Sequence, residues 1–74
     1  MEERVREVMA AILGLEEDEI EDDTSPNTVE SWDSLKHMNL ILALEEEFDV
    51  EFSDDQVVEL TSYREIRETL AELV

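Results

Sequence analysis

The sequence predicts an all-α fold, a three-to-four-helix bundle with a long loop between the first and second helices. Two observations lead to this prediction: apolar residues recur at helical spacing, and no segment sustains the alternation of apolar and polar residues typical of a half-buried strand. The 74 residues fit a single domain, residues 1–74, without internal repeat or linker. A domain of this size buries only about 60% of its unfolded surface, which favours binding or carrying over catalysis in a large cleft.

The first helix is expected from about Glu2 to Leu13. Gly14, the only glycine in the chain, stands directly after it, where a residue in the left-handed conformation commonly ends a helix. The apolar stripe of this helix contains Val5, Val8, Met9, Ile12 and Leu13.

The helical pattern stops between Leu15 and Asp33. This segment is dense in carboxylates and turn-forming residues, and the acidic run at 16–19 is expected to form one helical turn. A connection this long in a compact domain is usually functional or disordered. We expect it to be ordered by three apolar side chains that contact the core: Leu15, Ile20 and Val29.

The second helix is predicted to begin at the Asp33-Ser34 pair and to end near Phe48. Its apolar residues cover much of its circumference, which predicts a central position in the bundle. One line of them runs through Leu35, Met38 and Leu42, and Leu40, Ile41 and Leu44 widen the apolar face.

Two short helices are expected after it. Ser53 with Gln56 has the pattern of a capping box for a helix that ends near Leu60. Ser62 with Glu65 forms a second such pattern, which opens a helix with Ile66, Leu70 and Leu73 on one face.

The charge of the chain limits its partners. Five Lys and Arg face 23 Asp and Glu, a net charge of −18, which argues against nucleic acid and anionic membrane surfaces. It favours protein partners with basic docking patches, although acidity can also serve solubility alone. No apolar run approaches the roughly 20 residues of a membrane span, and no basic and apolar leader is present, so we expect a cytoplasmic protein that begins at Met1 and inserts in no membrane.

Catalytic and metal sites are not expected. Asp33, Ser34 and His37 have the residue types of a nucleophilic triad, but they crowd into one helical turn, and His37 is expected to face solvent. The acidic run at 18–23 resembles a calcium loop without its central glycine and bidentate glutamate. The absence of cysteine excludes a disulfide framework and a Cys-based metal site. The chain is therefore predicted not to be an enzyme.

Segments in two predicted helices resemble the acyl carrier proteins. Asp33-Ser34-Leu35, followed by residues 42–48, is similar to the carrier-site helix of that family, and residues 2–5 and 12–15 resemble its first helix. The resemblance covers essentially the whole chain, and the loop is its least similar part.

This resemblance implies that Ser34 carries a 4′-phosphopantetheine arm, added from coenzyme A by a separate phosphopantetheinyl transferase. Asp33 and Leu35 would support the site, with Asp33 capping the helix or orienting the transferase. A phosphodiester suits a helix N-terminus, where N–H groups are unpaired and the dipole is positive. The thiol of the arm would hold an acyl group as a thioester, and an apolar cargo would enter a space lined by Leu40, Leu42 and Ala43.

The same resemblance implies monomeric behaviour and transient complexes with acyl-loading and acyl-processing enzymes. The residues expected to contact these partners are Lys36, His37, Asn39, Glu45 and Glu46. The sequence departs from fatty-acid carriers at Trp32, commonly a small residue, and at Lys36 and Asn39, commonly acidic. Fatty-acid, polyketide or specialised acyl biosynthesis therefore stays open, as do an aminoacyl or D-alanyl carrier and an acidic interaction module without prosthetic group.

Overall fold

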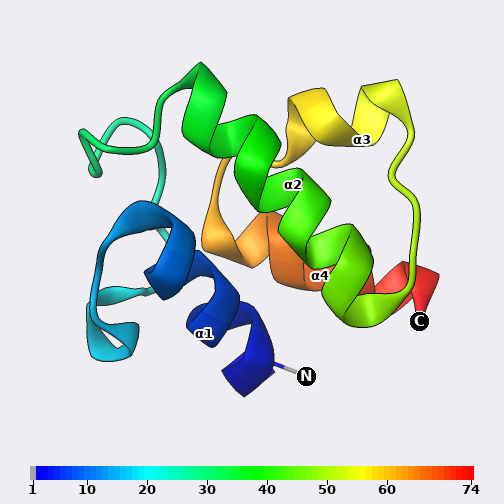
Figure 1. Ribbon diagram of the computed structural model, residues 1–74, viewed down its shortest axis with the longest axis horizontal. Coiled ribbons are helices and arrows are strands. Elements are labelled where there is room, and N and C mark those ends of the chain that lie inside the picture. Colours follow the sequence, from blue (N-terminus) through cyan, green and yellow to red (C-terminus); the bar gives the residue numbers. More distant parts are fainter. Residues whose placement is uncertain (1) are drawn as a thin grey trace.

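The computed structural model describes residues 2–74, and within that range it contains helices and no strand. In chain order these elements are α1 (Glu2–Leu13), the 3-10 turn η1 (Glu17–Glu19), α2 (Ser34–Phe48), α3 (Asp54–Glu59) and α4 (Tyr63–Leu73) (Figure 1). The all-α prediction with a long loop before the second helix is confirmed.

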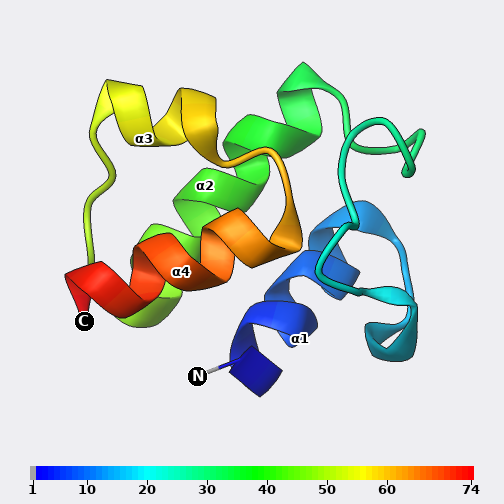
Figure 2. The ribbon, with the colours of Figure 1, turned by 180° about the vertical axis from the view of Figure 1, so that it is seen from behind.

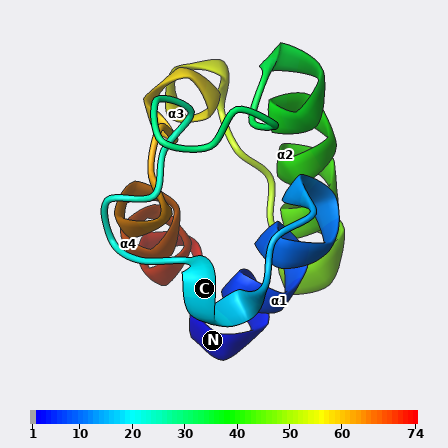
Figure 3. The ribbon, with the colours of Figure 1, turned by 90° about the vertical axis from the view of Figure 1, so that its left-hand side faces the viewer.

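The helices surround one apolar core. α1 packs against α2, and α4 lies across the back of α2, with the long loop at the end of the molecule opposite the C-terminus (Figure 2). Viewed end-on, α1 and α2 lie on one side, and α3 and α4 on the other (Figure 3). The core side chains between them are Val5, Met9, Leu13, Ile20, Trp32, Leu40, Ile41, Leu44, Phe52, Leu60, Tyr63, Ile66 and Leu70.

The apolar residues of α2 predicted a central position, and α2 does contribute to the core, but only one side of the helix is buried. Its core side consists of Leu40, Ile41 and Leu44, which are at most 2% exposed. The other predicted line stays on the surface. Its members are Leu35, 70% exposed, Met38, 49% exposed, and Leu42, 56% exposed.

The ends of the helices follow from local sequence. Ser53 and Gln56 form the reciprocal capping box at the start of α3. At the start of α4 the predicted box is half formed: Ser62 accepts from the Glu65 N–H, but the Glu65 carboxylate accepts from the Thr61 and Ser62 hydroxyls instead of the backbone. Gly14 ends α1 with a φ of 71°, as expected for a residue in the left-handed region.

The loop before α2 is ordered against the core, as predicted. Ile20 is buried, and Leu15 and Val29 pack partly against the same cluster. Hydrogen bonds fasten the loop to α4 and α1. The N–H groups of Tyr63 and Arg64 donate to the carbonyls of Thr24 and Asp22, and the Ser31 hydroxyl donates to the Leu13 carbonyl. The chain that enters α2 is therefore held from both sides.

A charged contact joins the ends of α1 and α2. Arg4 Nη2 lies 2.8 Å from Glu47 Oε1. The hydrogen bond from Arg4 lowers the pKa of the Glu47 carboxyl, although desolvation opposes that change. A lowered carboxyl pKa stabilises the fold above the ordinary carboxyl range, and this contribution is lost as the pH falls through the lowered value. Because both side chains are well exposed, the contribution to stability is small.

Exposed carboxylates of the loop repel one another. All carboxylates between residues 16 and 23 are exposed, and within residues 2–74 only Asp22 among them pairs with a cation, Arg67, at 2.8 Å.

Raising NaCl from about 10 mM to 150 mM shortens the Debye length from about 30 to 8 Å. We expect the unfolding midpoint to rise by about 5 °C. An unchanged midpoint in thermal melts would contradict the repulsion, and a larger rise with MgCl2 at equal ionic strength would indicate specific cation binding.

The ring of Tyr63 contacts two arginine side chains, and its hydroxyl is unpaired within residues 2–74. The guanidinium groups of Arg6 and Arg67 each lie 5.5 Å from the centre of its ring. The hydroxyl is buried and has no hydrogen-bond partner in the described part of the chain. Tyr63→Phe keeps the ring and removes the unpaired group, so we expect the free energy of unfolding to rise by about 1 kcal/mol in denaturant melts. A loss of stability would show that the hydroxyl has a favourable interaction.

Candidate functional site

Ser34 is the first residue of α2, and its side chain is exposed. The preceding residue, Asp33, occupies the N-cap position with extended backbone, and its carboxylate accepts the Lys36 N–H at 2.9 Å. The expectation that Asp33 caps the helix is met by this geometry. Because Asp33 caps the helix, the Ser34 hydroxyl is not needed for that purpose.

The hydroxyl of Ser34 differs from those of the four other serines. Within residues 2–74 it takes part in no hydrogen bond, whereas each of the others does. Ser25 accepts from the Asn27 N–H, Ser31 donates to Leu13, and Ser53 and Ser62 cap helices. Ser34 is therefore the serine whose hydroxyl is both exposed and uncommitted.

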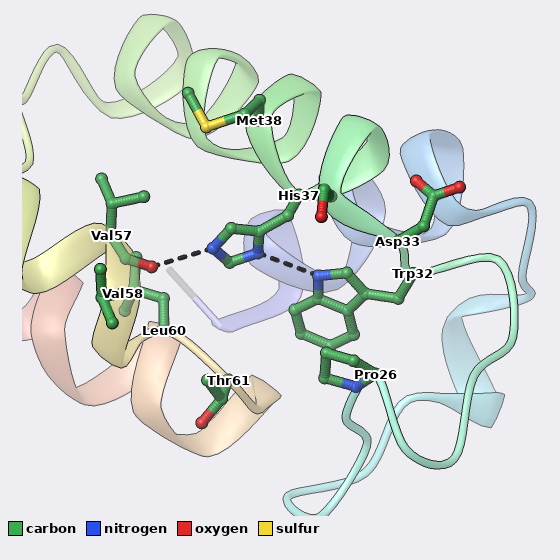
Figure 4. A pocket seen from close by; sticks show the side chains of 10 residues that line it. Pro26, Trp32, Asp33, His37, Met38, Val57, Val58, Leu60 and Thr61 are labelled. Atoms are coloured by element: carbon green, nitrogen blue, oxygen red, sulfur yellow. Dashed lines mark hydrogen bonds between the residues drawn. The ribbon is translucent and has the colours of Figure 1, made fainter.

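Two side chains form a hydrogen-bonded bridge next to Ser34. Trp32 Nε1 lies 3.0 Å from His37 Nδ1, and His37 Nε2 lies 2.9 Å from the Val57 carbonyl oxygen (Figure 4). An indole nitrogen only donates, so Nδ1 of His37 accepts and its Nε2–H donates to Val57. We call this arrangement the Trp32–His37–Val57 bridge. It connects the loop, α2 and α3.

The bridge corrects two interpretations of the sequence. His37 was expected to face solvent and partner proteins, but it is half-buried and both ring nitrogens bond within the domain. Trp32, noted only as an unusual residue before Asp33, is 3% exposed and belongs to the core. The sequence signal available for it was a large aromatic residue in an otherwise polar loop.

An open, mostly apolar pocket of about 480 Å³ adjoins Ser34. It lies between α2 and α3, and the bridge forms part of its wall (Figure 4). Its lining residues are Pro26, Trp32, Asp33, Ser34, His37, Met38, Val57, Val58, Leu60 and Thr61.

The predicted cargo space between helices is not formed by the residues named for it. Leu40 is completely buried among core side chains, Leu42 is 56% exposed, and Ala43 is half-buried. Leu40 and Leu42 are two residues apart on α2 and point about 200° apart around its axis, so the three side chains do not share one cavity wall. None of the three lines the pocket beside Ser34.

The remaining predicted site residues fall into two groups. Leu35, Lys36 and Asn39 lie on the first turns of α2 near Ser34, with Leu35 and Asn39 exposed and Lys36 half-buried. Glu45 and Glu46 lie about 17 Å from Ser34 along the helix axis. Glu46 is exposed, whereas the Glu45 carboxylate accepts the Phe52 N–H at 2.9 Å and so has a role inside the domain.

Residues 2–74 contain neither a cluster of metal-ligating side chains nor a membrane-spanning helix. No group of three or more His, Asp or Glu side chains could hold a metal ion. No helix in the described range is long and apolar enough to cross a membrane.

These features fit a 4′-phosphopantetheine group. A phosphodiester on Ser34 would lie at the N-terminus of a 15-residue helix, where backbone N–H groups lack intrahelical partners. The rest of the arm would begin at the rim of an apolar pocket that Ser34 itself lines. A small helical bundle with an uncommitted serine in this position has the form of a carrier domain.

Comparisons with known proteins agree with this class. The family described as "Phosphopantetheine attachment site" matches residues 3–70. The solution NMR structure of a holo acyl carrier protein from Geobacter metallireducens is similar to this fold, with a TM-score of 0.85 and 22% sequence identity. That match covers 96% of this chain and 82% of the Geobacter chain. The chain thus belongs to the family of phosphopantetheine-attachment domains, and 4′-phosphopantetheine is its covalent prosthetic group.

Proposed function

We propose that Ser34 is the attachment residue and that this protein is a non-catalytic carrier of acyl groups. The observation that carries the proposal is the Ser34 hydroxyl, exposed at the head of α2 and the only serine hydroxyl in residues 2–74 without a hydrogen bond. The arm, when bound, supplies a thiol on which an acyl group is held as a thioester, a chemistry that a chain without cysteine cannot supply itself.

The chain's own residues position the arm. Asp33 fixes the start of α2, so the attachment point keeps a constant orientation for partner enzymes. The free N–H groups of the first turn favour the phosphate charge. Met38 and Val58 give the pocket an apolar surface along which the arm can lie.

The surface near Ser34 favours dedicated partners over generic fatty-acid enzymes. Arg4, Arg64 and Arg67 all form ion pairs, whereas Lys36, two residues after Ser34, forms none within residues 2–74. A partner that docks its own Lys or Arg at this position meets a cation instead of a carboxylate. Like charges at an interface slow association and reject the wrong partner. We therefore propose a specialised acyl carrier that is served by its own acyl-loading enzymes.

Reversing the charge of this face should change partner choice. Lys36→Asp/Asn39→Glu is expected to speed malonyl loading by a generic transacylase about tenfold at low salt, because charge steering changes association rates by that order or more. The increase should shrink at high salt. The measurement is the loading rate of the holo form of each variant.

Arg64→Asp is a suitable control, because it makes the same charge change as Lys36→Asp on α4, away from Ser34. Its rate is compared with that of the single variant Lys36→Asp, which makes the same change of −2 in net charge, and equal rates for these two would assign the effect to net charge alone. Equal rates for the wild type and the double variant would contradict a dedicated partner face and favour generic fatty-acid synthesis.

Protein purified from its native host can be used to determine which class of cargo the carrier holds. Intact mass before and after mild hydrolysis of thioesters is expected to show an acyl group that hydrolysis removes, with the arm remaining on the protein. A released amino acid would instead assign an aminoacyl or D-alanyl carrier. A chain without any added mass would support an acidic interaction module.

A further inference from the structure

The Trp32–His37–Val57 bridge crosses the gap between α2 and α3 at the inner wall of the pocket. His37 belongs to α2 and Val57 to α3, and the imidazole lies between them in Figure 4. Trp32 backs the imidazole from the loop side, with the two rings 6.1 Å apart and inclined by 26°. Core side chains lie behind this wall, among them Leu40 and Leu44, which are completely buried.

Each hydrogen bond of the bridge satisfies a group that has few alternatives. The Val57 carbonyl lies in the last turn of the six-residue helix α3, where carbonyls lack intrahelical partners. The Trp32 indole is 3% exposed, so its N–H cannot turn to water without leaving the core. A guest that separated His37 from Trp32 would leave the buried indole N–H unpaired.

We infer that His37 is a specificity-determining residue that closes the passage between α2 and α3 to a tethered cargo. The inference rests on the proposed attachment of the arm at Ser34. With the bridge closed, a cargo remains in the open pocket, where its distal part contacts water. The carrier then gains little from a long apolar chain, so its cargo is an acyl group with a short apolar part or with polar substituents.

The test uses the full chain loaded with cargo of graded length. A promiscuous phosphopantetheinyl transferase with acetyl-, hexanoyl- or decanoyl-coenzyme A supplies the three forms, and intact mass confirms each. For the wild type we expect the same thermal unfolding midpoint for all three. For His37→Ala we expect the midpoint to rise by about 5 °C or more from acetyl to decanoyl, because the longer chain enters the opened gap and buries apolar surface.

Two further variants complete the test. His37→Gln should behave as the wild type, because its amide accepts from the indole and donates to the Val57 carbonyl. Trp32→Phe keeps an aromatic ring but removes the indole donor, and should show an intermediate dependence on chain length, even if His37→Ala does not fold.

The results separate the inference from the proposal on which it rests. A wild-type midpoint that climbs with chain length as steeply as that of the variants would overturn the role of His37, as would variants that are as insensitive to length as the wild type. Absence of any added mass would instead count against Ser34. The emission of Trp32, the only tryptophan, reports the bridge in the unloaded protein and should change in His37→Ala.

Discussion

Ser34→Ala is expected to abolish attachment of 4′-phosphopantetheine while the helical bundle stays intact. The substitution removes the hydroxyl oxygen that would bond to phosphorus, and no other serine hydroxyl in residues 2–74 is both free and placed beside the pocket. The side chain is exposed and is not the helix cap, so the free energy of unfolding should change by no more than about 0.5 kcal/mol. Intact mass after incubation with coenzyme A and a promiscuous transferase measures the loss.

Ser31→Ala provides the matched control, because Ser31 lies three residues before Ser34, in the loop that enters α2, and its hydroxyl donates to the Leu13 carbonyl. This variant should accept the arm at the wild-type level and lose about 1 kcal/mol of stability with its hydrogen bond. An arm that attaches to Ser34→Ala as readily as to the wild type would refute the assignment.

Trp32→Ala should have the largest effect on stability of the substitutions considered. Trp32 is 3% exposed, packs in the core and donates to His37. Truncation of such a side chain costs about 3–5 kcal/mol, and a 74-residue domain has roughly 4–11 kcal/mol in total. We expect a strongly lowered urea midpoint and, at low salt, partial unfolding.

Trp32→Phe distinguishes packing from hydrogen bonding. It retains most of the apolar contact and loses the indole N–H, so we expect a loss of about 1–2 kcal/mol, attributable to the unpaired His37 nitrogen. If Trp32→Ala unfolded within about 1 kcal/mol of the wild type, the loop would not depend on Trp32 for its position.

Helix boundaries were predictable because their signals are local. The predicted start and end of the first helix agree with α1, since the apolar stripe and Gly14 define it within a few residues. The head of α2 was found in the same way, because Asp33 caps the helix through a contact only three residues away.

The buried side of α2 and the role of His37 depend on contacts distant in sequence. The apolar composition of α2 predicted a central position, but it does not tell which apolar residues face the core and which, like Leu35 and Leu42, stay exposed. His37 meets a carbonyl twenty residues later, on a separate helix, and no local pattern encodes that partner.

The same contrast applies to the candidate site. Ser34 was predicted to be the attachment residue from its motif and its place at the head of a helix, both readable in the sequence. The pocket was not, because its wall combines Pro26 of the loop, His37 of α2 and Val57 of α3, which only folding brings together.

The attachment of the arm to Ser34 is tested most directly by fragmenting the intact holo protein in a mass spectrometer. The added phosphopantetheine mass should appear in every N-terminal fragment that includes Ser34 and in none that ends at Asp33. An added mass that maps to Ser25, Ser31, Ser53 or Ser62, or to no single residue, would contradict the account.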